Sequence, residues 1–298
     1  MLFLFRSYMY ILIAAAIIPA VLLIRFIYKE DRLEKEPASM IRRLVLLGVV
    51  STWLASILER IGFGFLEKSI SEMDPKFYFI EFFVIVGPAE EISKYIFLKL
   101  GSWKRPEFDC QFDAIVYAVS VSLGFALWEN IQYVFSYGLS VALTRAFTAV
   151  PGHACFGVLM GAWYGMARKY EGRGEFEKAK KYKRLAVIMP VIAHGAYDFF
   201  ATISGYIGSL AFIVLIIILF FICSKLVNVL AENDTYINNQ EDFQFLSDKF
   251  TSDQLIRIKF HFVVVITNIF CNKIYTFPYY EVNKLLSLFH IKENYVLL

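Results

Sequence analysis

Long apolar segments, separated by short charged ones, make up most of the first 230 residues of the chain. Several of them reach about 18 mostly apolar residues, the length at which a helix can cross the hydrocarbon core of a bilayer. Backbone groups in lipid must be hydrogen-bonded within their own segment, so we expect these segments to be helices. About seven spans are predicted, over residues 7–28, 39–60, 77–100, 112–137, 141–167, 184–204 and 206–230. The pattern therefore predicts an all-α, polytopic membrane protein.

The last part of the chain, residues 232–298, has a different character. Asn, Asp and Gln become frequent at its start, and its apolar run FHFVVVITNIF, residues 260–270, is too short to span a membrane. The change predicts two domains: a transmembrane domain over residues 1–231 and a small cytoplasmic domain or tail over residues 232–298. Nothing in the second part indicates a chemistry.

Lysine and arginine are unevenly distributed among the loops, and cytoplasmic loops carry the excess of these residues. The predicted first, third and fifth loops are basic, whereas the short fourth loop holds Arg145 alone and the sixth holds no basic residue. We therefore expect the odd-numbered loops and the C-terminus in the cytoplasm and the N-terminus outside. The predicted location is the plasma membrane.

Composition agrees with a membrane protein and disfavours other classes. Of the 298 residues, 58% are hydrophobic and 19% are charged, and the mean hydropathy is +0.55. Soluble domains are nearer about half apolar and about a quarter charged. The net charge of +3 is too small to indicate a nucleic-acid partner. The four cysteines form no CxxC pair, so we expect all of them to be reduced.

Ionisable residues inside apolar spans are rare and costly, and by default they indicate function. The first group lies in GPAEEISKYIFLKL, residues 87–100. Its opening Gly-Pro pair is expected to break or kink the helix. Glu90 and Glu91 then fall in the first turn of the following half-helix, where the dipole favours negative charge. Glu90 and Lys94 are four residues apart and share a face, so the alternative reading is a buried ion pair that locks two helices.

Further polar groups lie in three later spans. Glu129 and Asn130 occur in GFALWENIQYVF, where a hydrogen bond to a neighbouring helix is the alternative to a site. His153 follows a proline that should kink its helix, and the glycines spaced every four residues after it are typical of close helix packing. His194 and Asp198, four residues apart, face one direction. Such a pair suits a metal, a histidine oriented by a carboxylate, or an interhelical hydrogen bond.

Residues from four different spans fall at a similar depth. At about 1.5 Å per residue, Glu90 and His194 lie about 15 Å from the cytoplasmic ends of their spans. By the same rise, Glu129 and His153 lie about 20 Å in, near the middle of a hydrocarbon core about 30 Å thick. We therefore expect these four side chains to converge on one site.

These segments, in this order, resemble the PrsW family of intramembrane proteases. The matching pieces are GPAEEISK (87–94), FDAIVYAVSVSLGFALWEN (112–130), RAFTAVPGH (145–153) and AHGAYD (193–198), and the charged stretch YKEDRLEKEP (28–37) also resembles the family. The family is distantly similar to the type II CAAX prenyl endopeptidases, although the last motif here is HxxxD rather than HxxxN. Ala114 and Ala118 stand where the family is expected to have glycine, which concerns helix packing and not chemistry.

The resemblance implies hydrolysis of a peptide bond in a membrane-associated protein, and by analogy site-1 cleavage of a membrane-anchored anti-sigma factor. The implied partners are that substrate and the lipid bilayer. Two histidines with carboxylates suit zinc, which is the expected cofactor. The candidate site residues are a catalytic set, Glu90, Glu91, Lys94, Glu129, Asn130 and Asp198, and the metal ligands His153 and His194.

Glu90 is favoured as the general base because it shares a face with Lys94, and the two histidines would bind the zinc that polarises water and carbonyl. A metal-free mechanism, in which Glu90 and His153 activate water directly, stays open.

Two other classes of protein would also bury Glu, His and Lys in a membrane. A proton- or cation-coupled transporter is the first, but transporters often contain repeats with paired broken helices, and no repeat is visible in this sequence. A non-catalytic scaffold or sensor is the second. In such a protein these residues would serve packing alone. Replacing them would unfold the protein, and no catalytic activity would be lost independently of the fold.

Overall fold

The computed structural model describes residues 2–74 and 76–237. The helices are α1 (Leu2–Glu30), α2 (Ala38–Ser69), α3 (Lys76–Ile80), the π-helix η1 (Glu81–Val86), α4 (Gly87–Ser102), α5 (Asp113–Tyr137), α6 (Leu139–Phe147), α7 (Ala149–Gly172), α8 (Phe176–Thr202) and α9 (Tyr206–Glu232). The described residues contain no strand, only an isolated bridge between Cys110 and Tyr236. The all-α prediction is confirmed. The predicted C-terminal domain, including the apolar run at 260–270, lies almost entirely outside the described residues.

Six helical segments of the described chain are long and apolar enough to cross a membrane. They are Met9–Glu30, Ala38–Ser69, Asp113–Tyr137, Leu139–Gly172, Phe176–Thr202 and Tyr206–Glu232. The predicted span 77–100 is helical as well, but η1 divides it, and its longest piece, α4, has 16 residues. The kink expected from Pro151 falls at Thr148, between α6 and α7. The proline then lies in the first turn of α7, where its missing N–H is tolerated.

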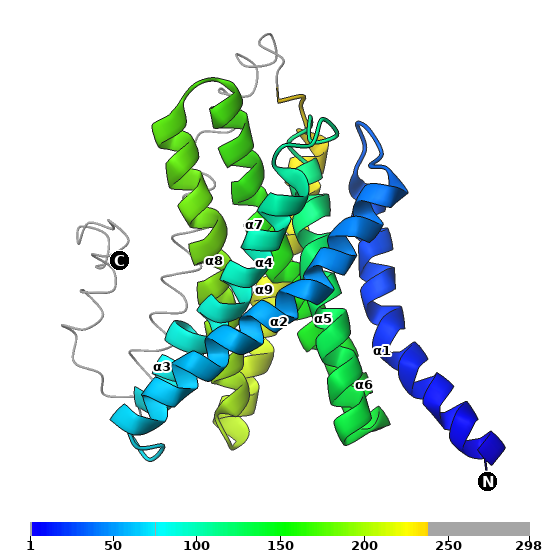
Figure 1. Ribbon diagram of the computed structural model, residues 1–298, viewed down its shortest axis with the longest axis vertical. Helices are drawn as coiled ribbons and strands as arrows, with labels where there is room; N and C mark the ends of the chain where they lie inside the picture. Colours follow the sequence, from blue (N-terminus) through cyan, green and yellow to red (C-terminus); the bar gives the residue numbers. More distant parts are fainter. Residues whose placement is uncertain (1, 75, 238–298) are drawn as a thin grey trace. The chain divides into compact units, whose positions relative to one another are not determined.

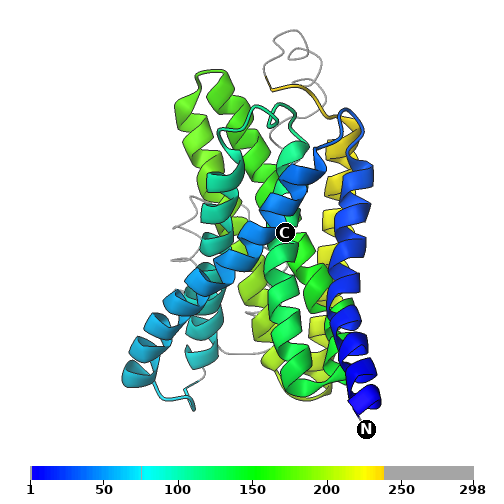
Figure 2. The ribbon, with the colours of Figure 1, turned by 45° about the vertical axis from the view of Figure 1, so that its right-hand side comes forward.

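Helices α5 and α7 form the centre of the bundle. About four fifths of their membrane-crossing segments are buried (78% each), against 22–28% for α1, α2 and α9. Helix α2 runs obliquely across α4 and α5 and contacts both (Figure 1). Helices α7 and α8 form a long hairpin beside α4, and the turned view shows α1 and α9 along the opposite side (Figure 2). Within these helices, the buried Glu, Lys, Asn and His side chains come from α4, α5, α7 and α8.

The glycine stripe of α7 lets α5 approach it closely, as the sequence predicts. A Cβ atom at Gly157 would lie 2.8 Å from the Cα of Val119, and one at Gly161 would lie 2.6 Å from the Cα of Ile115. These atoms belong to the backbone of α5, which cannot move aside as the end of a side chain can. The two helices thus pack backbone to backbone, and this close contact sets the distance between the residues that they carry into the site.

Gly161→Ala is expected to lower the free energy of unfolding by about 1–3 kcal/mol, the usual effect of overpacking. Gly64→Ala is the matched control, because a Cβ at Gly64 in α2 would meet nothing within 4 Å. There the same change should stabilise the protein by up to about 1 kcal/mol through helix propensity. Unfolding in mild detergent, followed by tryptophan fluorescence, measures both. A Gly161→Ala protein as stable as the wild type would contradict the close α5–α7 contact.

Candidate active site

At the Gly-Pro pair, where the sequence predicts a break or kink, the chain stays helical but changes from the π-helix η1 to the α-helix α4. The N–H of Gly87 donates to the carbonyl oxygen of Phe82, five residues back, as in a π-helix. A Cβ at Gly87 would lie 3.2 Å from the carbonyl oxygen of Val191, so glycine lets the backbone of α8 come close here. Pro88 lies in the first turn of α4, where no hydrogen bond is lost. The next turn then carries its polar side chains into the bundle.

Lys94 lies at the centre of the buried polar side chains and is 0% exposed. Its Nζ donates to Glu91 Oε1 at 2.8 Å and to Glu90 Oε2 at 3.0 Å. The same Nζ lies 3.0 Å from Nδ1 of His153, so each of its three protons has an acceptor. The ammonium group also lies 4.0 Å from the centroid of the Phe125 ring. Lys94 thus balances two carboxylates of its own helix and links them to α5 and α7.

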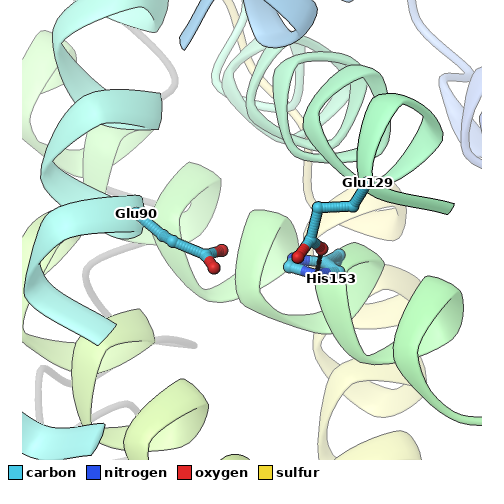
Figure 3. Close-up of side chains that lie close together, drawn as sticks. All are labelled: Glu90, Glu129 and His153. Carbon is cyan, nitrogen blue, oxygen red and sulfur yellow. Dashed lines mark hydrogen bonds and ion pairs between the residues drawn. The ribbon is translucent and has the colours of Figure 1, made fainter. Parts of the chain in front are cut away.

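His153 connects the α4 residues to Glu129. Glu90 extends from α4 toward His153 of α7 and Glu129 of α5 (Figure 3). His153 Nε2 lies 2.9 Å from Glu129 Oε2. Because Nδ1 accepts from Lys94, Nε2 carries the ring proton and donates to Glu129, an assignment that follows from these partners. The network therefore runs from Lys94 through the imidazole to the carboxylate.

Arg145 supports Glu129, a role that the sequence reading missed because it placed this residue in a short loop. Its Nη2 lies 3.2 Å from Glu129 Oε2, and its Nε donates to Asn130 Oδ1 at 3.2 Å. Asn130 in turn donates to the carbonyl oxygen of Ala16 in α1 at 3.0 Å. Asn130, one of the predicted catalytic residues, therefore contacts Arg145 and α1 and holds Arg145 in place.

His194 of α8 adds a second imidazole to the site. Its Nδ1 lies 2.9 Å from Glu91 Oε1, and its Nε2 lies 3.2 Å from Asp198 Oδ2. The spacing of four residues between His194 and Asp198 thus produces the contact that it predicts. The ring centroids of His153 and His194 are 5.3 Å apart. The two imidazoles of the sequence prediction are neighbours, and each has a carboxylate partner of its own.

Glu59 of α2 is a further acidic residue, missed by the sequence reading, that interacts electrostatically with the site. Its charge interacts with those of Glu129, His194 and Lys94. The predicted span ended at residue 60, which placed this glutamate at a membrane boundary, whereas α2 continues to Ser69. The apolar residues 61–66, which come after Arg60, are the signal that could have revealed it.

Two overlapping sets of side chains at this site could hold a metal ion. They are Glu90, Glu129 and His153, and Glu90, Glu91 and His194, each with ligand atoms within 4.8 Å of one another. Glu91 Oε2 is buried and has no hydrogen-bond partner, so one carboxylate oxygen is available. Nitrogen and oxygen donors of this kind suit zinc. The residues present therefore fit a metal, and Glu90 belongs to both sets.

The fold and the site together define a class of protein. Glutamates, histidines and a lysine from four helices meet inside a membrane-crossing bundle, and burial in lipid is costly for each of them. Carboxylate next to imidazole is an arrangement that binds and activates water. The protein is thus a multi-pass membrane protein whose site is that of a hydrolase working inside the membrane.

Comparison with known proteins gives the family. The sequence model described as PrsW family intramembrane metalloprotease matches residues 36–224. Protease PrsW of Bacillus subtilis (strain 168) is 35% identical over 195 residues, which cover 65% of this chain and 84% of that protein. Protease PrsW of Clostridioides difficile (strain 630) is 31% identical over 208 residues, covering 68% and 84%. No solved structure matches the chain. The chain belongs to the PrsW family.

Membership of this family confirms the resemblance noted from the four motifs. The protein is an intramembrane protease, and its family is described as one of metalloproteases. Its substrate is accordingly a membrane protein, and it works in the lipid bilayer.

Proposed function

We propose that the metal of this protease is zinc and that Glu90 is the base that activates water for peptide-bond hydrolysis. The observation that carries the proposal is the position of Glu90, whose carboxylate lies within 4.8 Å of the possible ligand atoms of Glu129 and His153 and of those of Glu91 and His194. A base must lie beside the water that it deprotonates, and a metal-bound water would lie beside every ligand. Glu90 is the one residue that both sets share.

Glu91 differs from Glu90 in its surroundings, although the two are adjacent. Glu91 is 0% exposed and its Oε1 contacts both Lys94 and His194, whereas Glu90 is 6% exposed. Water can therefore reach Glu90 more readily than Glu91. We assign Glu91 to anchoring Lys94 and His194, and Glu90 to taking a proton from water and returning it to the leaving amine.

His153 and Glu129, from one of the two sets, and His194, from the other, would together hold the zinc. Zinc bound there would polarise the scissile carbonyl and make the bound water more acidic. All four ring nitrogens have protein partners in this structure, so binding would replace one partner of each ring. Asp198 would then orient His194, and Lys94 would stabilise the negative charge that develops next to Glu90.

The proposed substrate is a membrane-anchored anti-sigma factor cut at its first site, which is what the family resemblance implies. The proposed location is the plasma membrane, with the N-terminus outside and the C-terminus in the cytoplasm. The support for this orientation is the excess of Lys and Arg in the loops that follow the first, third and fifth predicted spans.

The zinc content of purified variants tests the proposal. The wild type and Glu90→Gln are expected to hold near-stoichiometric zinc, whereas His153→Ala should lose most of it, because a base can be replaced without removing a ligand. Protein purified in mild detergent is analysed by atomic emission, and the fluorescence of the tryptophans checks that each variant is folded. If all three preparations lack zinc and only the wild type cleaves a single-span substrate, the metal-free mechanism with Glu90 and His153 replaces this one.

A further inference from the structure

Glu59 is an ionisable side chain inside the apolar helix α2, and the proposed catalytic residues do not include it. The buried face of α2 carries Gly48, Thr52 and Ala55. Glu59 follows Ala55 by four residues and so lies on the same face. Arg60 lies about 100° further around the helix and is exposed. Glu59 thus faces the bundle, whereas the arginine next to it faces away.

The register of α2 against η1 and α4 places Glu59 level with the active site. A Cβ at Gly62 of α2 would meet Ile85 of η1 at 2.5 Å. One at Gly101, near the end of α4, would meet Leu47 near the start of α2, at 2.6 Å. The two segments therefore run in opposite directions. Because Glu59 precedes Gly62 by three residues, it is level with the first turn of α4, and that turn carries the proposed base.

The charges around Glu59 agree with this register. The charge of Glu59 interacts with those of Lys94 of α4, Glu129 of α5, and His194 and Asp198 of α8. These four residues come from three different helices and all belong to the site. Glu59 therefore borders the site on the side of α2.

Helices α2 and α5 separate from each other before they reach this level. They cross where both have glycine, since a Cβ at Gly48 would meet the carbonyl oxygen of Val121 and one at Gly124 would meet that of Val45. Both ribbon views show the two helices diverging from this crossing toward their C-terminal ends (Figures 1 and 2). Glu59 lies about three turns beyond the crossing and is partly exposed. A substrate segment that enters between α2 and α5 therefore passes Glu59.

The cations of the site do not neutralise Glu59. Lys94 contacts two carboxylates of its own helix, and Arg145 contacts Glu129 at 3.2 Å. In the part of the chain that the structure describes, Glu59 takes part in no ion pair and belongs to neither set of possible metal ligands at the site. A carboxylate without a cation is costly inside a membrane. The matching positive charge is therefore expected to come from a molecule that binds.

We propose that Glu59 is a specificity-determining residue, which pairs with a lysine or arginine of the substrate near the cleaved bond. The protease activity of the family supplies the binding molecule, a membrane protein whose chain must reach the first turn of α4. Packed helices lie about 8–10 Å apart, and an extended chain advances about 3.3 Å per residue. The basic residue therefore lies within about three positions of the cleaved bond. This holds whether zinc or a carboxylate–imidazole pair activates water.

Selectivity among matched peptides tests the inference. The full chain in mild detergent is given a single-span peptide that it cleaves, and mass spectrometry locates the cleaved bond. Lysine, glutamine or glutamate is then placed in turn at each position close to that bond, on both sides. At one or more positions, the wild type is expected to cleave the lysine peptide with kcat/KM about tenfold above that of the glutamine peptide, near the lower end of measured couplings between close charges at interfaces. The glutamate peptide should be cleaved more slowly than both.

Substitution of Glu59 identifies the residue responsible. Glu59→Gln should remove most of the preference for lysine, Glu59→Asp should keep much of it, and Glu59→Lys should favour the glutamate peptide instead. Glu67→Gln is the matched control, because it makes the same change at an exposed acid of α2, and it should keep the wild-type ratio. The ratio of kcat/KM values is the readout, because a loss of folding or of the proposed base lowers the cleavage of all peptides together.

Three results would overturn the inference. The first is a wild type that cleaves the lysine, glutamine and glutamate peptides equally at every position, a result that needs no variant to fold. The second is a Glu59→Gln protein with the wild-type ratio, and the third is an equal loss of preference in Glu67→Gln. A wrong assignment of the base would appear instead as normal cleavage by Glu90→Gln, with these ratios unchanged.

Discussion

Glu90→Gln is expected to lower the rate of substrate cleavage by about 10²–10⁴-fold, the usual contribution of a general acid–base group. Glutamine has the same shape and keeps an oxygen for Lys94, which contacts Glu90 at 3.0 Å, but it cannot take a proton from water. The fold should be retained, because Lys94 still has Glu91 as its partner at 2.8 Å. Cleavage of a single-span membrane substrate by purified protein in mild detergent measures the loss.

Glu91→Gln is the matched control, since it makes the same change one residue along α4. Glu91 contacts both Lys94 and His194 and is 0% exposed, so its loss should reduce stability more than Glu90→Gln does. Melting temperature and cleavage rate, measured on the same preparations, separate the two roles. Normal cleavage by Glu90→Gln, together with a folded but inactive Glu91→Gln, would transfer the role of base to Glu91.

Lys94→Met is expected to lower the free energy of unfolding by about 3–5 kcal/mol, the usual cost of removing one partner from a buried ion pair. The two carboxylates of Glu90 and Glu91 would remain buried after the substitution. They would lack the ammonium group that lies within 3.0 Å of both in the wild type. Methionine fills a similar volume, so the loss of the charge, and not a cavity, accounts for most of the change in the free energy of unfolding. Thermal unfolding in mild detergent measures the change, and activity should be lost with it.

Lys99→Met is the control for this change, because Lys99 is an exposed lysine of the same helix. Its replacement should alter stability by no more than about 0.5 kcal/mol. Adding Glu91→Gln to Lys94→Met removes one of the uncompensated charges and should recover part of the lost stability. If the two changes are simply additive, the contact between Lys94 and Glu91 contributes little and the ion-pair explanation is wrong.

Much of the fold was predictable because membrane insertion makes each helix nearly independent of the others. A run of about 18 apolar residues predicts a span whatever its neighbours are, and six such helices are present in the described part of the chain. An irregularity at the Gly-Pro pair was predictable for the same reason, since it depends on local backbone chemistry. Its form, the π-helix η1, was not, because it depends on the close approach of α8 to Gly87.

The sequence by itself determined the contacts that lie within one helix. Glu90 with Lys94 and His194 with Asp198 are each four residues apart, and helix geometry places such pairs on one face. Only the tertiary structure decided the contacts between helices. It placed Lys94 against His153, turned Asn130 toward Arg145, and brought His194 against Glu91. The physical reason is that these contacts depend on how each helix is rotated and spaced against its neighbours. Backbone approach at glycines and the π-helical turn set that packing, and the spacing of residues along one chain segment does not contain it.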